Sequence, residues 1–245
     1  RLTQHYFMTA PMPCPYLPGR FERKLVTELR GPEANGVHDL LSRAGFRRSH
    51  SIAYLPACSD CNACVPVRVS CADFKPGRSF RRIQAKNDDI VRSIVPPSAT
   101  QEQFQLFSTY QDARHGNGDM ARMDARDYRA MVEDSTIDTS IFEYRRPDGS
   151  LIAVALVDNL SDGLSAVYSF FDPKEHKRCL GTYIILDLIA EAQTFEFPHI
   201  YLGYWISDCR KMSYKMRFQP LEGFKNGGWE IMSDDATQAR PNGSS

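Results

Sequence analysis

Three cysteines at regular spacing are the residues best suited to do chemistry. Cys58, Cys61 and Cys64 lie within one short segment. A Cys-x-x-Cys pair is a good chelator because its two sulfurs can converge on one ion, so the segment predicts a zinc or iron–sulfur site. A closed site needs a fourth ligand, for which Cys14, flanked by two prolines, is the first candidate and Cys71 the second. The alternative is a set of reduced, partly buried thiols without a metal.

The use of cysteine also indicates a compartment. The chain has 7 cysteines, an odd number, and a secreted disulfide scaffold would be shorter and denser in cysteine. A reducing compartment is therefore expected, with Cys179 and Cys209 outside the metal site. No apolar run reaches the roughly 18 residues of a membrane span, and no signal peptide is visible. A cytoplasmic protein without membrane contact is predicted.

The charge balance limits what the chain can bind. Of its 245 residues, 30 are Lys or Arg and 30 are Asp or Glu, so the formal net charge is zero. The whole molecule is therefore not a general polyanion binder, and contact with nucleic acid must come from local basic patches. Two stretches qualify, with solvated faces as the alternative. Their cations are Lys75, Arg78, Arg81, Arg82 and Lys86 in the first, and Arg210, Lys211, Lys215 and Arg217 in the second.

The elements that position these groups follow from the hydrophobic pattern. Apolar residues recur at helical spacing over residues 37–44, and residues 65–69 indicate a short strand. Pro96-Pro97-Ser98 is the clearest linker signal. The sequence therefore predicts a small cysteine-containing N-terminal domain over residues 1–95 and a larger C-terminal domain over residues 96–235.

The larger domain changes its periodicity along the chain. Helices are predicted over residues 102–114, 124–133 and 181–195, and strands over residues 140–144, 151–157, 164–171 and 199–203. Turn residues separate the first three strands, which favours an antiparallel meander. This order of elements resembles a GNAT-type acyltransferase core, so the predicted fold class is α+β. The polar residues 236–245 are expected to form a disordered tail.

The loop before the long helix refines this resemblance. GNAT acetyltransferases hold the coenzyme A pyrophosphate with an Arg/Gln-x-x-Gly-x-Gly/Ala loop, where backbone N–H groups and the helix dipole bind phosphate. Here Arg178 and Gly181 match, but Tyr183 replaces a small residue that lets phosphate approach. An ordinary helix start is the alternative. The departure argues against coenzyme A as the donor and not against acyl transfer.

Short motifs over residues 5–232 resemble one family, the arginyl-tRNA–protein transferases, in the order found in that family. The N-terminal motifs are CPYLPGR at 14–20, GFRRS at 45–49, AYLPAC at 53–58 and CVPVR at 64–68. The C-terminal motifs are YSFFDP at 168–173, LG at 180–181, YLGYW at 201–205 and KMSYK at 211–215. The short bacterial branch, the aspartate/glutamate leucyltransferases, is the most similar.

The resemblance implies transfer of leucine from leucyl-tRNA to proteins that begin with Asp or Glu, which creates a degradation signal. The arginyl branch has Cys-x-x-Cys near its start and an adjacent cysteine pair later. This chain instead has Cys14 alone, with Leu17 at the second position, and the later triple. The chemistry of the zinc or cluster therefore stays open. No other cofactor is expected, because the aminoacyl ester is already activated and no phosphate-loop motif is present.

Transfer of the aminoacyl group requires an amine that has lost its proton, donors for the oxyanion, and close positioning of two large substrates. Asp172 follows the last meander strand and is assigned as the base or as an orienter of the amine, with an Asp-Pro turn as the alternative. Tyr168 and Tyr214 are assigned to the same site, where they could stack on the 3′-adenosine. Ordinary core aromatics are the alternative for both, and Trp205 is expected in the core.

Arginine is the natural partner of an acceptor carboxylate because its planar fork donates two hydrogen bonds. At least one arginine should therefore face the cleft between the domains. The candidates are Arg47, Arg48, Arg78, Arg81 and Arg82. The residues assigned to tRNA contact are Arg178, Gly181, Lys211, Lys215 and Arg217.

Other functions remain open from the sequence. The donor could be arginyl-tRNA, or the chain could be a GNAT N-acetyltransferase that uses acetyl-coenzyme A. A third reading is a non-enzymatic, zinc-containing RNA-binding protein, which would bind tRNA whether or not it carries an amino acid.

Overall fold

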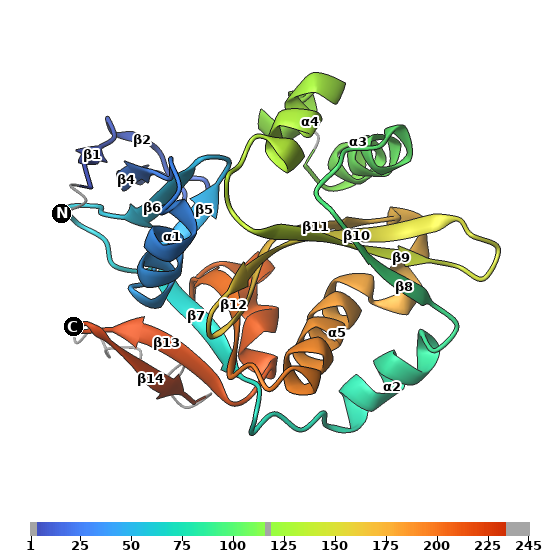
Figure 1. The fold of residues 1–245 in the computed structure, drawn as a ribbon. Helices are drawn as coiled ribbons and strands as arrows, with labels where there is room; N and C mark the ends of the chain where they lie inside the picture. The colour runs from blue at the N-terminus through green and yellow to red at the C-terminus, as the bar shows by residue number, and fades with distance from the viewer. Residues whose placement is uncertain (1–3, 116–118, 234–245) are drawn as a thin grey trace.

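An eight-stranded sheet forms the centre of the computed structural model, which describes residues 4–115 and 119–233 (Figure 1). The strand order is β14-β13-β7-β12-β11-β10-β9-β8. The strands are β7 (Val65–Ser70), β8 (Val91–Val95), β9 (Thr139–Arg145), β10 (Leu151–Leu160), β11 (Gly163–Phe171), β12 (His199–Trp205), β13 (Leu221–Lys225) and β14 (Gly228–Met232). β11 and β12 pair parallel, whereas the other neighbours pair antiparallel.

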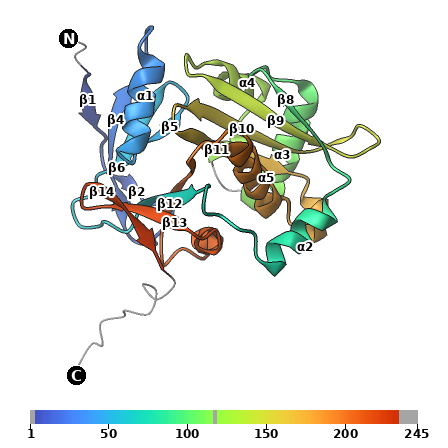
Figure 2. The same cartoon turned by 60° about the horizontal axis from the view of Figure 1, so that its bottom comes forward.

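Helices cover both faces of this sheet, as Figures 1 and 2 show. On one face lie α2 (Arg78–Lys86) and α5 (Leu180–Thr194), and on the other lie α3 (Gln101–His115) and α4 (Ala125–Glu133). β10 is buried almost throughout because both its faces are covered. Three shorter helical segments are η1 (Asp119–Arg122), η2 (Pro173–Arg178) and η3 (Arg210–Arg217). No helix in the described part of the chain is long and apolar enough to cross a membrane.

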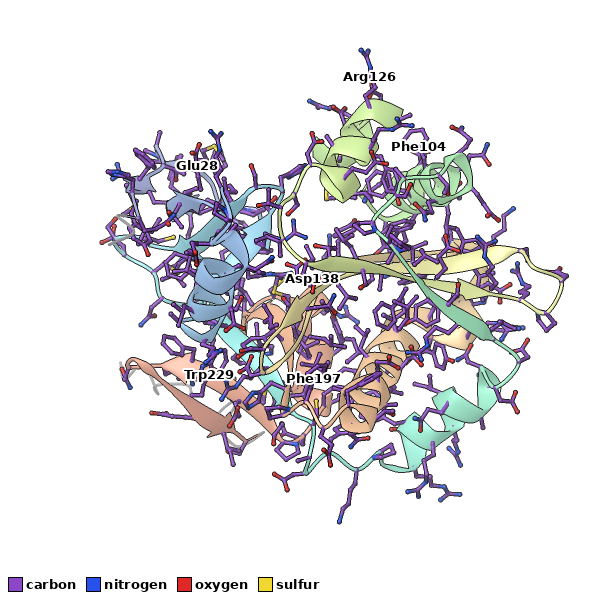
Figure 3. All side chains as sticks on the ribbon, in the orientation of Figure 1. Glu28, Phe104, Arg126, Asp138, Phe197 and Trp229 are labelled. Carbon is purple, nitrogen blue, oxygen red and sulfur yellow. The ribbon has the colours of Figure 1, made fainter. Side chains whose placement is uncertain are left out.

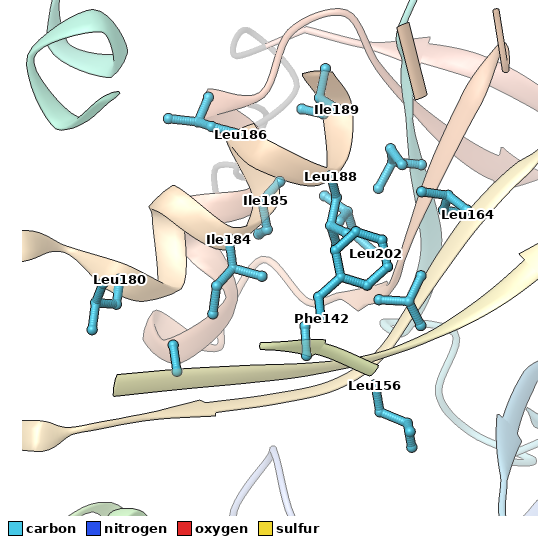
Figure 4. Close-up of a cluster of buried hydrophobic side chains, with 14 of the residues drawn as sticks. Phe142, Leu156, Leu164, Leu180, Ile184, Ile185, Leu186, Leu188, Ile189 and Leu202 are labelled. Carbon is cyan, nitrogen blue, oxygen red and sulfur yellow. The ribbon is translucent and has the colours of Figure 1, made fainter. Parts of the chain in front are cut away.

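The main core lies between α5 and the sheet. Ile184 and Leu188 recur at helical spacing and are buried. Figure 4 shows both side chains beside Phe142 of β9 on one side of the sheet, whereas Leu156 of β10 lies on the other side. This packing fixes the start of α5 against the end of β11, so the loop between them is held on two sides.

The segment before β7 adds a four-stranded sheet in the order β1-β4-β6-β5. The elements of this segment are β1 (Tyr6–Met8), β2 (Met12–Pro13), β3 (Phe21–Glu22), β4 (Lys24–Glu28), α1 (Ala34–Arg43), β5 (Arg47–Ser49) and β6 (Ile52–Pro56). A buried ionic cluster joins it to β10. Asp158 accepts two hydrogen bonds of 2.6 Å from Arg48 and one of 2.9 Å from His38 Nε2.

The predicted α+β class is confirmed, and so are the predicted helices and strands listed by residue above, as α1, α3, α4, α5, β7 and β9 to β12. Sequence reasoning missed α2, the strands before β7, and β8, β13 and β14. α2 is short and turns only two large apolar residues, Phe80 and Ile83, to the core, so its apolar pattern is too brief to detect. The eight-stranded sheet takes β7 and β8 from residues before 96, so it crosses the predicted boundary. Residues 236–245, the predicted tail, lie outside the described residues.

Candidate active site

β11 and β12 separate along their length and open a wedge in the sheet. Their parallel pairing begins at Gly163 opposite His199 and ends at Ser165 opposite Tyr201. On the β10 side, Val157 pairs with Ala166 and Leu156 with Tyr168, so Val167 is an extra residue in β11. Such a bulge bends a strand and turns its carbonyl groups away from the ladder. The carbonyl groups at this point are therefore free to accept hydrogen bonds from a side chain.

Arg47 from β5 enters the wedge. Its Nη2 donates to the carbonyl oxygens of Ala166 and Val167, at 3.2 and 3.0 Å. On the other side it lies against Gly203 of β12, where an added Cβ would be 1.7 Å from Arg47 Nη1. Gly203 also has a positive φ of 76°, so glycine is required there twice over. Within the described part of the chain, no carboxylate forms an ion pair with Arg47.

A second cation without a carboxylate lies beside Arg47. Lys215 of η3 is only 6% exposed, and its Nζ donates to the Tyr204 carbonyl oxygen at 2.5 Å. Burial, and next the charge of Arg47, lower the pKa of Lys215 from 10.5 to about 7. The neighbouring Tyr214 is 38% exposed. Arg47 and the partly protonated Lys215, neither of which has a carboxylate partner among the described residues, mark a place where an anionic ligand would be stabilised.

Of the two predicted tyrosines, Tyr214 lies near this pair, whereas Tyr168 packs against α3. Burial raises the pKa of Tyr214, and Arg47 and Tyr110 act on it in opposite directions. Burial, with Tyr110 again a neighbour, also raises the pKa of Tyr168. The Tyr168 hydroxyl accepts a hydrogen bond of 2.5 Å from Gln111 Nε2. Tyr168 is therefore held by α3, through Gln111 and Phe107.

A cavity of about 720 Å³ lies between the N-terminal segment and the end of β12. The four predicted cysteines line it together with Tyr16, Tyr54, Tyr204 and Trp205. Burial, and then the other three cysteines, raise the pKa of Cys64 to about 12. Cys71 is buried elsewhere, and Cys179 and Cys209 are absent from the cavity lining, as expected.

The cysteine set fits zinc or an iron–sulfur cluster in donor type, since four thiols face one cavity. Its arrangement does not yet fit. Among residues 4–115 and 119–233, no three His, Cys, Asp or Glu side chains are placed to hold a metal ion. Cys14 Sγ instead accepts a hydrogen bond from Leu17 N, and Cys58 Sγ donates to the Arg23 carbonyl oxygen. No step of the transfer reaction is therefore derived through a metal.

Asp172 has a structural position. It is the N-cap of η2, and its Oδ1 accepts a hydrogen bond of 2.9 Å from Lys174 N. Its Oδ2 lies 3.7 Å from Arg146 Nη2. These are the contacts of the Asp-Pro turn that was the alternative. Its assignment as a base is left without geometric support.

The two loop residues assigned to tRNA contact, Arg178 and Gly181, already make close contacts within the protein. Arg178 pairs with both carboxylate oxygens of Asp89, at 2.6 and 2.8 Å, and with Glu175 at 2.9 Å. Gly181 lies under Phe171, whose Cε1 would be 3.2 Å from an added Cβ. Close packing explains this glycine without a phosphate. Both residues therefore have roles in the loop itself, and their contact with tRNA stays a prediction.

The five candidate acceptor arginines differ in burial, in partners and in their place in the fold. Arg48 is 5% exposed and held by Asp158, so its assignment is corrected to a structural role. The other three lie on α2, at the opposite end of the sheet from β5 (Figure 1). These are Arg78, Arg81 and Arg82. Arg47 and Arg48 both lie where the N-terminal segment meets the eight-stranded sheet, and of these two only Arg47 has no carboxylate partner among the described residues.

The two predicted basic stretches meet in space. Phe80 of α2 stacks on Phe218, which follows η3, with ring centroids 4.9 Å apart. The Arg217 guanidinium lies over the Phe80 ring at 5.0 Å. We call the resulting patch the α2–η3 surface. Its exposed cations are Arg78, Arg81, Arg82 and Lys86 of α2 and Arg210, Lys211 and Arg217 of η3. Lys215 does not belong to it because it is buried, which corrects its assignment to tRNA phosphate.

Of the four buried side-chain polar atoms without a hydrogen-bond partner among the described residues, His38 Nδ1 and Asp162 Oδ1 belong to ion-paired residues, and two others were missed by sequence reasoning. Gln111 Oε1 and Trp205 Nε1 are buried and have no hydrogen-bond partner among the described residues. Neither residue type signals a site by itself. Trp205 belongs to the YLGYW motif and was expected in the core, where it does lie at 8% exposure. Its unpaired N–H could not be predicted because it depends on tertiary packing.

Comparison with known proteins gives a consistent set of relatives. Residues 102–225 match the family described as arginine-tRNA-protein transferase, C terminus, and residues 12–82 match its N terminus. An aspartate/glutamate leucyltransferase of Paramagnetospirillum magneticum is 57% identical over 225 residues, covering 92% of each chain. One of Gluconacetobacter diazotrophicus is 54% identical over 235 residues, covering 96% of this chain and 90% of its own. Among solved structures, L-PGS from Bacillus licheniformis has a TM-score of 0.46 at 11% identity, over 59% of this chain and 46% of that one.

Proposed function

The chain belongs to the arginine-tRNA–protein transferase family, and we propose that it transfers leucine from leucyl-tRNA to the N-terminal Asp or Glu of acceptor proteins. It is an aminoacyltransferase. The leucyl donor and the acidic acceptor come from the names of its relatives. The product would carry a new N-terminal leucine, which serves as a degradation signal in the cytoplasm.

The reaction needs no activation step within this chain. The acceptor α-amine attacks the carbonyl carbon of the leucyl ester, a C–N bond forms, and the ester C–O bond breaks. The electron pair of that bond goes to the ribose oxygen, and the proton lost by the amine ends on the released hydroxyl. Because an α-amine has a pKa of roughly 7.7–8.0, part of it is already unprotonated near neutral pH. Positioning of the two substrates is then the main task of the protein.

One observation carries the acidic preference. Arg47 is half-buried at the junction of the two family regions and has no carboxylate partner among the described residues. Lys215 lies beside Arg47 and also has no carboxylate partner among the described residues. An acceptor carboxylate placed between them would satisfy both cations, whereas the amide of Asn or Gln would not.

We infer that residues 96–235 form a GNAT-type core. The antiparallel order of β9, β10 and β11 supports this inference, as do the bulge in β11, the wedge between β11 and β12, and the start of α5 directly after the loop. In such a core the wedge is where acyl donor and acceptor meet. An acetyl-coenzyme A donor is disfavoured because Arg178 is neutralised by Asp89 and Glu175.

The α2–η3 surface is our proposed contact for the tRNA body. It gathers exposed cations from two parts of the chain, and residues 75–87 contain no carboxylate. Phosphate contact would make binding weaken with salt. Binding there leaves the wedge free for the aminoacylated 3′ end.

The cysteine cavity is proposed to hold zinc or an iron–sulfur cluster after a local rearrangement of the loop at residues 58–64. The supporting observation is the common cavity of Cys14, Cys58, Cys61 and Cys64. Metal analysis and visible absorption of protein purified without oxygen test it. Metal-free protein with full transfer activity would rule the group out of function.

The decisive experiment offers labelled leucyl-tRNA or arginyl-tRNA with peptides that begin with Asp, Glu, Asn or Ala. We expect label to appear only with leucyl-tRNA and the acidic peptides. Transfer from arginyl-tRNA would show that arginine is the donated amino acid. Labelling from acetyl-coenzyme A would show that the chain is an acetyltransferase. If charged tRNA bound to the protein but no peptide became labelled, the chain would be an RNA-binding protein and not a transferase.

A further inference from the structure

We infer that the outer edge of β1 is an interface at which a second copy of this chain pairs, so that two N-terminal sheets join into one. The inference goes beyond the proposed function and does not depend on it. It assigns a partner to an apolar surface that the transfer reaction does not use.

β1 lacks the features that usually protect an edge strand from pairing. It is the outermost strand of the N-terminal sheet and pairs only with β4 among the described strands (Figures 1 and 2). Each of the other edge strands in the three described sheets carries a charge or a proline. These residues are Arg47 and Arg48 in β5, Arg92 in β8, Glu230 in β14, Pro13 in β2 and Glu22 in β3. β1 reads Tyr6-Phe7-Met8 and has neither feature, so its edge is open to another strand.

Exposed apolar side chains gather on β1 and on the β2–β3 hairpin beside it. Of the 11 exposed large apolar residues in the described part of the chain, 5 lie within residues 6–21. We call them the β1–β3 patch: Tyr6, Phe7, Met8, Met12 and Phe21. Residues 4–19 contain no Lys, Arg, Asp or Glu. A charge-free apolar surface of this kind marks a contact with another protein.

The composition and size of the β1–β3 patch fit a second copy. Nucleic acid would require cations, and a partner steered by charge would require charges, whereas homodimer interfaces are more apolar than other interfaces. The five side chains are 45–66% exposed. At roughly 200 Å² for a large side chain, they present about 500 Å². This is more than half of the about 800 Å² that each partner contributes to a stable interface.

The hydrogen-bonding pattern of β1 makes its edge complementary to itself. Thr9 N donates to the Lys24 carbonyl oxygen at 2.9 Å, and the register between β1 and β4 has no shift. Because backbone groups alternate in direction along an antiparallel strand, those of Phe7 also face β4, and those of Tyr6 and Met8 face outwards. With a two-fold axis at Phe7, Tyr6 lies opposite Met8 of the partner subunit. Each such pair can exchange N–H···O=C bonds in both directions, with the two Phe7 side chains adjacent at the axis.

Amide hydrogen exchange, followed by NMR, tests the interface in the unmodified chain. The N–H groups of Tyr6 and Met8 face outwards in a single copy and should exchange quickly at low protein concentration. Their exchange should slow by about tenfold or more as the concentration rises and the copies pair. The N–H groups of Phe7 and Thr9 face β4 and should be protected at every concentration, which makes them the internal control.

Light scattering of variants tests the position of the axis. The original chain should approach twice the mass of one chain as its concentration rises. Phe7→Asp and Phe7→Lys should each stay at the mass of one chain, because like charges then lie opposite each other. An equimolar mixture of the two should recover the double mass, because opposite charges then face across the axis. Ile231→Asp, a change at a residue 73% exposed on β14, is the matched control and should pair as the original chain does.

Three results would overturn the inference. One is an original chain that keeps the mass of one chain, with fast exchange at Tyr6 and Met8, at all concentrations. Another is a dimer that persists in Phe7→Asp, which would place the interface elsewhere. The third is slow exchange at Tyr6 and Met8 that requires an Asp-initiated peptide and not a higher protein concentration, which would assign the edge to the acceptor polypeptide. If the Phe7 variants fold poorly by circular dichroism, the exchange measurement on the original chain decides alone.

Discussion

Arg47 is the residue at which the acceptor's acidic side chain should be recognised. The change Arg47→Lys keeps the charge but loses the planar fork that grips a carboxylate with two hydrogen bonds. We expect the peptide KM to rise about tenfold or more, since one charge-assisted hydrogen bond is worth roughly 1.5–3 kcal/mol. The preference for Asp over Asn should fall with it. Initial rates with matched Asp and Asn peptides measure both.

The matched control for Arg47 is Arg82→Lys on the exposed face of α2. It should leave the peptide KM and the Asp-over-Asn ratio unchanged. Unaltered discrimination in the Arg47 variant would contradict its assignment and leave the acceptor side chain to be read elsewhere.

Lys215 should make stability depend on pH. In the unfolded chain its ammonium has a pKa of about 10.4, whereas in the folded chain the pKa is about 7. Below pH 7 both states hold the proton, and the full cost of burying the charge, several kcal/mol at about 1.4 kcal/mol per pKa unit, opposes folding. As the pH rises from 7 towards 10 only the unfolded state keeps the proton, so the free energy of unfolding rises.

Lys215→Met should therefore be more stable relative to the original chain at pH 6 than at pH 9. Urea unfolding at both pH values measures the difference. Lys211→Met, an exposed change in the same segment, should show no such trend. A gain in stability that is equal at both pH values would mean that Lys215 is not buried as a charge.

The GFRRS motif illustrates how far sequence reasoning reaches at this scale. It correctly brings Arg47 and Arg48 into view as neighbours in one motif. It cannot separate them, because adjacent residues of a strand point to opposite faces and their partners come from distant segments. Arg48 meets Asp158, and Arg47 meets the carbonyl groups of β11. Only the tertiary arrangement gives Arg48 a carboxylate partner and leaves Arg47 without one among the described residues.

Among the elements, β5 and α1 are attached to β10 by the buried cluster around Asp158. Burial opposes the charge of Asp158, but hydrogen bonds from His38 and Arg48 outweigh it and hold the pKa of this carboxyl below its ordinary value. The stability it contributes is present above about pH 4 and is lost as the pH falls through the lowered pKa. In Arg48→Met, the buried Asp158 carboxylate would lose its hydrogen bonds from Arg48, and its remaining contacts would not offset the cost of burying its charge.

We expect Arg48→Met to lower the free energy of unfolding by about 3–5 kcal/mol, the usual cost of breaking one partner from a buried ion pair. Adding Asp158→Leu should recover part of this loss. Arg126→Ala, whose side chain is 94% exposed on α4 (Figure 3), is the surface control and should have almost no effect. A small loss in Arg48→Met would show that the cluster does not hold the two sheets together.

The α2–η3 surface should behave as one unit towards tRNA. Replacing Arg78 and Arg82 together with Gln should weaken leucyl-tRNA binding and reduce its salt slope by about 1.4–1.8, since each phosphate contact contributes roughly 0.7–0.9. Filter binding over a salt series measures it. The peptide KM should not change. An unchanged slope would move the tRNA contact away from this surface.

The elements that sequence reasoning found are those with long, regular apolar patterns, such as α5 and β10. It could not find β5, whose three residues are Arg47, Arg48 and Ser49, because strand pairing there depends on neighbours and not on hydrophobic alternation. The candidate active site depends on β5. The part of the fold that positions Arg47 is therefore the part with the weakest sequence signal.

For the whole molecule, the eight-stranded sheet makes the two halves of the chain depend on each other. β7 lies between β12 and β13, and β8 pairs with β9. A fragment of residues 96–245 lacks both strands and would expose the edges of β12 and β9. We expect it to be unfolded or aggregated by circular dichroism and gel filtration, and co-expression with residues 1–95 to restore soluble protein. A well-folded fragment would show that the sheet does not need β7.

The central position of β7 has a consequence for synthesis. β7 leaves the ribosome long before β12 and β13, the two strands that flank it. At roughly 5–20 residues per second, the nascent chain must hold it unpaired for on the order of ten seconds. Val67 and Val69 are then exposed to water and to other chains, although both are buried in the finished protein. Pro66 and Arg68 alternate with these valines. Pro66 has no N–H to donate to a neighbouring strand, and Arg68 carries a charge. Both features keep an unpaired strand from pairing with the wrong partner.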